Sequence, residues 1–260
     1  LILGGIILGI YTGLLGYVGA KTGLSLDLLS QRAFGEKGSY LPSAMTSFTQ
    51  IGWFGVGSFV SGGTATPNFA RFAKDGKAGA ITTVVAFFIG NSLMFFFGAV
   101  SSIFVGGNDI FEVMVRLNLF YLAVLVLGLN IWTTNDNALY TAGLGLANIF
   151  HQRKKPMVLL SGIIGTVASV WLYYNFCGWL NILNCTLPPV GMILVLAYFM
   201  NKKDFETDQP KLKTVDWFAV AGVILGAIVA NLLHWGIASI NGMVVAAVCY
   251  CVGQAVNKRK

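Results

Sequence analysis

The sequence predicts an all-α protein that crosses a membrane several times. Of its 260 residues, 56% are hydrophobic and only 10% are charged, whereas a soluble domain usually carries about 25% charged residues. Several apolar runs reach the roughly 20 residues that a helix needs to cross a bilayer. Runs such as Phe87-Phe88-Ile89 lack the alternation of apolar and polar residues that a transmembrane β-barrel requires. The predicted class is therefore a polytopic helical membrane protein.

The first part of the chain is expected to hold apolar segments separated by basic connectors. Residues 1–20 form a glycine-rich span, and glycines allow close contacts between membrane helices. Residues 22–38 are amphipathic, which predicts a cytoplasmic loop with a short helix at the membrane surface. The apolar segments that follow cover 39–57, 58–69 and 78–104, and a basic connector lies at 71–77.

The second part of the chain is expected to contain five further spanning segments. The first covers residues 119–150 and ends at the basic stretch 151–155. A short uncharged turn is predicted at 178–184 and a polar connector at 201–213. The remaining spans are predicted over 156–176, 186–200, 215–233 and 240–256.

Lys and Arg gather in alternate connectors, which predicts the orientation in the membrane. The basic segments are 71–77, 151–155, 201–213 and 258–260. The connectors without Lys or Arg are those near 105–112, 177–184 and 234–239. Because basic loops stay in the cytoplasm, the C-terminus is predicted to be cytoplasmic. Membrane topology thus accounts for the net charge of +7, and no nucleic-acid partner is expected.

The stretch from residue 39 to residue 69 conflicts with this alternation. Basic segments flank it on both sides, so both flanks are expected in the cytoplasm. Only about 31 residues lie between them, whereas two crossings need about 40 residues plus a turn. Either a re-entrant hairpin or a missing internal stretch resolves the conflict, and the residues alone slightly favour the hairpin, because a contiguous chain is the default.

A polar stretch at residues 130–137 interrupts the apolar run 119–150. At about 100° per residue, one helix face collects Asn130, Thr133, Thr134 and Asn137. Unpaired polar groups are costly in hydrocarbon, so this face must contact protein, water or a ligand. Asp136 lies off that face and is expected to be a structural hydrogen-bond partner or a gating residue.

No residue pattern typical of an enzyme or of a structural metal site appears. The sequence has no Ser/His/Asp set and no paired carboxylates in a catalytic arrangement. The cysteines show no metal-ligand spacing with a histidine, and we expect them to be buried apolar residues: Cys177, Cys185, Cys249 and Cys251. We therefore predict a protein that is not an enzyme and has no cofactor.

Four stretches resemble the nucleobase:cation symporter family, and in particular its cytosine-transporting branch. They cover residues 17–24, 50–57, 87–95 and 127–140. The resemblance implies a single transmembrane domain over residues 1–260 with a LeuT-like inverted-repeat fold. The family has twelve helices and this chain about eight, so the fold is expected to be incomplete. The first helix is expected to be absent, and the internal gap to fall between Gly57 and Ser58, which we prefer to a hairpin.

The same resemblance implies sodium-coupled cytosine import by alternating access, and it implies which residues bind the base. Asn130 and Gln50 would hydrogen-bond to cytosine, whose edge both donates and accepts hydrogen bonds. Trp53, which shares a helix face with Gln50, and Phe59 would stack on its two faces. Ser61 would add a polar contact.

For the coupling ion, the resemblance points to the hydroxyl oxygens of Thr133 and Thr134 as ligands of Na⁺, with Asn130 as a further candidate. Carbonyl ligands from the absent first helix would complete the site. The expected protein is a monomer in the bacterial cytoplasmic (inner) membrane, with cytosine and Na⁺ as its ligands. The alternatives are a channel whose pore the polar face lines, and an inactive fragment of such a transporter.

Overall fold

The computed structural model describes residues 2–56, 66–106, 110–207, 210, 212–233 and 235–257, and the regular secondary structure in these ranges is helical. Among the described residues, four helices are long and apolar enough to cross a membrane: Gly76–Val105, Lys154–Leu172, Phe176–Met200 and Ala238–Asn257. Two shorter apolar helices cover Ile6–Thr22 and Trp217–Leu232. The all-α class and the several apolar helices of a membrane protein are thus confirmed.

One group of helices is built around α1 (Ile2–Thr22), which packs along α6 (Gly76–Val84) and the short helix α5 (Pro67–Ala70). Two glycines of α1 allow this close packing, because a side chain at either position would collide with the neighbouring helix. A Cβ on Gly16 would lie 2.4 Å from Thr83 Oγ1, and a Cβ on Gly19 would lie 2.7 Å from Pro67 Cα. Asp75 is the N-cap of α6: its carboxylate accepts a hydrogen bond from the backbone N–H of Ala78 at 2.8 Å. A π-helical turn, η1 (Val85–Gly90), connects α6 to α7 (Asn91–Val105).

A second group consists of α3 (Tyr40–Val56), α9 (Phe120–Phe150) and α10 (Lys154–Tyr174). The two glycines in the second half of α9 permit close approach. A Cβ on Gly145 would lie 2.1 Å from Ser47 Oγ on α3, and one on Gly143 would lie 2.2 Å from Val158 on α10. Ser47 Oγ also donates a hydrogen bond to the carbonyl of Ala142 at 3.1 Å. The second half of α9 is therefore firmly held.

The main hydrophobic core lies where α11 (Phe176–Met200) meets α1, α2 (Leu26–Phe34), α13 (Trp217–Leu232) and α14 (Ala238–Asn257). Its largest fully buried side chains include Tyr198, Tyr250, Phe34 and Ile193. Gly226 and Gly242 face each other across α13 and α14, which brings these two helices into backbone contact. Burial of this apolar surface holds α1 and α2, early in the chain, against the last three long helices.

The predicted turn at residues 178–184 is wrong. The chain instead turns at Asn175, and α11 then runs without interruption from Phe176 to Met200, through Pro188 and Pro189. Trp179 and Leu183 are one helical turn apart and are buried in a cluster with Ala138 of α9. Tertiary packing therefore keeps this stretch helical, and that packing is invisible to a count of charges and apolar residues.

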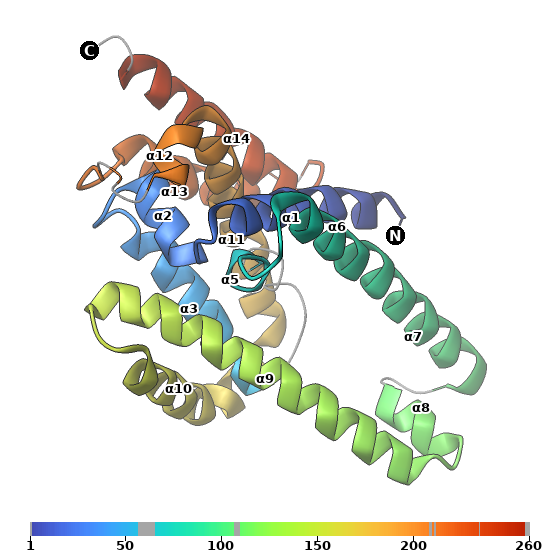
Figure 1. The fold of residues 1–260 in the computed structure, drawn as a ribbon. Coiled ribbons are helices and arrows are strands. Elements are labelled where there is room, and N and C mark those ends of the chain that lie inside the picture. The colour runs from blue at the N-terminus through green and yellow to red at the C-terminus, as the bar shows by residue number, and fades with distance from the viewer. Residues whose placement is uncertain are drawn as a thin grey trace.

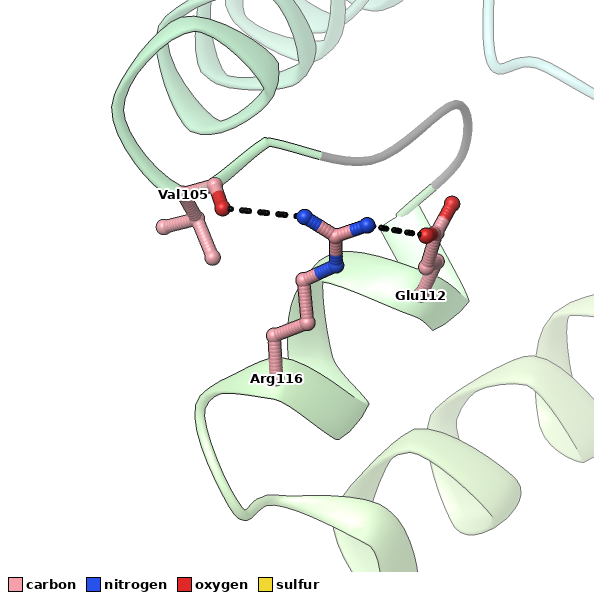
Figure 2. A network of polar contacts seen from close by, with 3 residues as sticks. All are labelled: Val105, Glu112 and Arg116. Atoms are coloured by element: carbon pink, nitrogen blue, oxygen red, sulfur yellow. Dashed lines mark hydrogen bonds and ion pairs between the residues drawn. The ribbon is translucent and has the colours of Figure 1, made fainter.

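An extended arm leaves these groups. Figure 1 shows α6 and α7 running outward and the first half of α9 returning, with α8 (Ile110–Arg116) between them. Apolar side chains along the arm are exposed, with Tyr121 at 88% and Trp132 at 72%. Near its tip, Arg116 pairs with Glu112 and approaches the carbonyl of Val105 (Figure 2). The one basic residue of α8 is thus neutralised by an acidic neighbour in the same helix.

Several basic connectors meet at the opposite end of the molecule. Tyr40 Oη lies 2.7 Å from His151 Nε2, and Arg32 Nη1 donates to the carbonyl of Asp204 in α12 (Lys202–Glu206) at 2.7 Å. The backbone of Glu36 donates to the carbonyl of Lys213 at 2.7 Å. Residues 21–38, 151–155, 201–207 and 212–213 therefore share one end, as the predicted topology requires. Which side of the membrane this end faces stays a prediction.

Candidate functional site

The predicted polar face is formed on a continuous helix, because α9 runs unbroken through residues 130–137. Thr134 Oγ1 donates a hydrogen bond to Asn130 Oδ1 at 3.1 Å. Thr133 Oγ1 donates to the carbonyls of Leu129 and Asn130, at 3.1 and 3.0 Å. Each hydroxyl thus uses its proton within the helix and keeps oxygen lone pairs for a cation. The nitrogen of the Asn130 amide takes no part in these bonds and remains able to donate hydrogen bonds.

This face is open in the described part of the molecule. Asn130, Thr133 and Asn137 are exposed, and Thr134 is half-buried. Asp136 is exposed too, and the described residues offer it none of the structural hydrogen bonds that we expected. Inside a bilayer, such a polar face would need cover from protein, water or a ligand. Its openness makes it the strongest candidate for a binding surface.

Gln50 lies on α3, where its side chain is buried. Asn148 of α9 donates a hydrogen bond to Ser43 of α3. Ser47, one turn later in α3, donates to the carbonyl of Ala142, which comes earlier in α9. The two helices therefore run antiparallel. Continuing this register by one or two turns brings Gln50 and the backbone of Trp53 level with the polar stretch of α9. The side chain of Trp53 lies outside the described residues. Phe59 and Ser61 lie outside them entirely.

Comparison with known proteins identifies the family. The family described as permeases for cytosine/purines, uracil, thiamine and allantoin matches residues 1–66 and 55–256. The chain belongs to this permease family. The cytosine permease of Escherichia coli strain K12 is 36% identical over 352 positions, which cover 100% of this chain and 83% of the relative. The cytosine permeases of E. coli O6:H1 and O157:H7 match with the same values. The family consists of transporters, which agrees with our prediction that the chain is not an enzyme.

Two features of these matches concern the continuity of the chain relative to its family. The family matches this permease in two pieces that overlap at residues 55–66. The alignment with the E. coli protein spans 352 positions, whereas the permease has 260 residues. At least 352 − 260 = 92 aligned positions therefore have no residue in this chain.

The permease also holds a buried polar cluster that we did not predict. Asp27 on α2 is only 5% exposed, and its Oδ1 accepts a hydrogen bond from Ser43 Oγ of α3 at 2.6 Å. Asn148 of α9 donates in turn to Ser43 Oγ at 2.8 Å and accepts from Gln31 Nε2 at 2.6 Å. Burial raises the pKa of Asp27 to about 6, against the opposing effects of the Ser43 hydrogen bond and the Arg71 charge.

One feature of the α2 sequence, a carboxylate on its apolar face, could have indicated this cluster. Asp27 shares a helix face with Ser30 and Phe34, and all three are buried. A carboxylate on the apolar face of an amphipathic helix indicates a buried hydrogen-bonded partner, because an unpaired buried charge is very costly. The identity of that partner, Ser43, depends on how α3 packs, so sequence spacing could not supply it.

Proposed function

We propose that this permease imports cytosine together with Na⁺ by alternating access across the bacterial cytoplasmic membrane, with its C-terminus in the cytoplasm. The observation that carries the proposal is the hydrogen bond between Thr134 and Asn130 on the polar face of α9. In this scheme Thr133 and Thr134 bind Na⁺ through their hydroxyl oxygens, which suit a hard cation. Asn130 binds the polar edge of cytosine through its amide.

The remaining predicted contacts complete the base site. Gln50 adds a second amide from α3, and Trp53 and Phe59 stack on the two faces of the planar base. Ser61 adds a polar contact. The buried position of Gln50, level with the polar stretch of α9, supports its part in this arrangement.

The Thr134–Asn130 bond gives a physical route for coupling. A cation on the Thr134 oxygen withdraws electron density from the O–H group, which then donates more strongly to Asn130 Oδ1. The Asn130 amide is thereby held in one orientation, with its N–H groups presented to the base. Since coupling free energy is reciprocal, cytosine must raise the affinity for Na⁺ by the same factor.

We further propose a LeuT-like fold in which part of the family's helices is missing between Gly57 and Ser58. The two-piece match and the 92 unfilled alignment positions support this gap. Helices in the gap would also cover the open face of α9.

Cytosine binding to this 260-residue chain, purified in detergent, tests the proposal directly. We expect saturable binding of radiolabelled cytosine that strengthens at least about tenfold when Na⁺ replaces choline, and uptake into proteoliposomes that needs a sodium gradient. Equal, non-saturating flux with and without the gradient would indicate a channel instead. A folded protein that binds no cytosine at any Na⁺ concentration would mark it as an inactive fragment.

A further inference from the structure

The short helix α5 connects the two helix groups of the permease. On one side, Pro67 packs directly against Gly19 of α1. On the other, Asn68 Oδ1 accepts a hydrogen bond from the backbone N–H of Leu26 at the start of α2, at 2.8 Å. Arg71, at the end of α5, donates through Nη2 to the hydroxyl of Tyr140 on α9. The end of α5 thus joins the α1 group to α2 and α9.

Tyr140 is held from several directions at this junction. The ring of Phe69 lies 6.0 Å from the Tyr140 ring, centroid to centroid. Lys154, at the start of α10, places Nζ 3.4 Å from the centroid of the same ring, within the range of a cation–π interaction. With the hydrogen bond from Arg71, these contacts fix Tyr140 between α5 and α10.

The location of the junction matters for transport. Tyr140 follows Thr134 by six residues, so it lies about 9 Å farther along α9. Beyond it, α9 continues for about 15 Å to Phe150, where the basic connectors meet. The junction therefore lies between the polar face and the basic end of the permease. A substrate that moves along α9 from the polar face toward the basic end therefore passes the level of the junction.

The junction also contains buried donors that lack hydrogen-bond partners in the described part of the chain. Asn68 is fully buried, yet its Nδ2 has no hydrogen-bond partner among the described residues, and neither has Arg71 Nε. Buried donors without partners cost free energy, and opening the junction to water would satisfy them. At the α3–α9 interface, by contrast, Gly145 leaves no room for even one methyl group. Separation of the two groups at the junction would therefore expose these two donors to water.

We propose that Asn68 and Arg71, together with the N–H of Leu26 and with Tyr140, form an inner gate that must open to release substrate toward the basic end. This proposal rests on the proposed transport function. In the described structure the gate is closed, because the hydrogen bonds Asn68–Leu26 and Arg71–Tyr140 are both made. When the gate opens, α5 moves together with α1 and α6, whereas α9 stays in place with α3 and α10.

A reversible cross-link tests whether the gate must open. The variant carries Phe69→Cys and Tyr140→Cys in a background without the four native cysteines. After treatment with a short cleavable bis-thiol reagent, we expect cytosine binding to persist and uptake to fall at least tenfold, with full recovery on reduction. Undiminished uptake by the fully cross-linked protein would overturn the proposal. Absence of cytosine binding before and after cross-linking would instead count against the proposed function.

A second measurement does not depend on transport. Ser30 is fully buried one helical turn after Leu26, and its hydroxyl has no hydrogen-bond partner among the described residues, so Ser30→Cys breaks no hydrogen bond. Arg71→Gln, or the milder Tyr140→Phe, is expected to increase the labelling rate of this cysteine by a hydrophilic maleimide about five- to tenfold.

The matched control for that measurement is Lys155→Gln, which removes one positive charge from an exposed position beside the junction. Its labelling rate should equal that of the parent. All variants are first checked for a single sharp thermal transition in detergent. Rates in Arg71→Gln and Tyr140→Phe that match the control would show that these bonds do not hold the gate shut.

Discussion

At the scale of single residues, the hydroxyl of Thr134 is the most informative group in the molecule. It lies within hydrogen-bond distance of Asn130 Oδ1, and it is one of the two hydroxyls proposed for Na⁺. One oxygen atom therefore touches both proposed sites. A change there should alter the coupling between the two ligands more than the affinity for either one alone.

Thr134→Val keeps the shape of the side chain and removes its oxygen. We expect cytosine affinity at saturating Na⁺ to fall about tenfold or more, and its dependence on Na⁺ to disappear, because typical coupling factors are about 5–150. Thr134→Ser retains the hydroxyl and should keep the dependence. Titration of labelled cytosine at several Na⁺ concentrations measures both quantities. Full sodium dependence in the valine variant would move the cation site elsewhere.

Asp27 leads to a prediction about pH. Its pKa is raised to about 6 in the folded protein, against about 3.9 in an unfolded chain. The folded state therefore holds the proton more tightly, and the free energy of unfolding should decrease as the pH rises from about 4 to about 6. The Asp27→Asn variant has no carboxyl group to titrate at this position, so its free energy of unfolding should not decrease in this way. Its amide oxygen can still accept the Ser43 hydrogen bond. Above pH 6 it should be more stable than the parent by on the order of 2–3 kcal/mol.

Thermal unfolding in detergent between pH 4 and pH 8 measures that difference. The control is Asp204→Asn, because Asp204 is exposed on α12. This variant should keep the pH profile of the parent. A profile for Asp27→Asn that also follows the parent would mean that the carboxyl does not titrate in this range.

At the scale of elements, α9 has two halves with different surroundings. Its first half lies along the exposed arm, whereas its second half is buried against α3 and α10 through residues such as Ala142 and Gly145. The polar stretch lies between the two. A helix that is anchored at one end and open in the middle is well suited to present fixed polar groups to a ligand.

Two glycines of this one helix provide a matched test of its anchoring. A Cβ at position 145 would lie 2.1 Å from Ser47 Oγ and 2.8 Å from the Ser43 carbonyl, whereas nothing lies within 4 Å of one at position 128. Gly145→Ala should therefore destabilise the protein by about 1–3 kcal/mol. Gly128→Ala should be neutral or stabilising, because alanine favours helix by about 1 kcal/mol. Equal melting temperatures of the two variants would contradict the close α3–α9 packing.

At the scale of the whole molecule, the gap proposed between Gly57 and Ser58 would explain the open polar face of α9. The face would be covered if the helices proposed to be missing there packed against it. The arm in Figure 1 would then be one wall of a larger bundle, with its apolar side toward lipid and its polar side toward the inserted helices.

Insertion of the corresponding segment of the E. coli cytosine permease between Gly57 and Ser58 tests that explanation. A reporter cysteine at Asn137, which is exposed in this structure, should react with a hydrophilic maleimide at least about tenfold more slowly after insertion. An unrelated pair of apolar helices of the same length serves as the control. Equal reactivity in the two insertions would show that the family segment does not cover α9.

Sequence alone was sufficient for the helical membrane class, the permease family and the polar stripe of α9. These follow from local composition and from the 3.6-residue period, which any stable helix over residues 120–150 must obey. The Thr134–Asn130 bond is of this kind, since residues four apart always meet on a helix.

Only the tertiary structure decided the features that depend on distant residues. Residues 178–184 remain helical because Trp179 and Leu183 are buried against α9. Asp27 is satisfied by Ser43 of α3, and Arg71 reaches Tyr140, 69 positions away, because α5 packs between two helix groups. Local sequence determines which face of a helix is polar. The packing of helices far apart in the chain determines what that face meets.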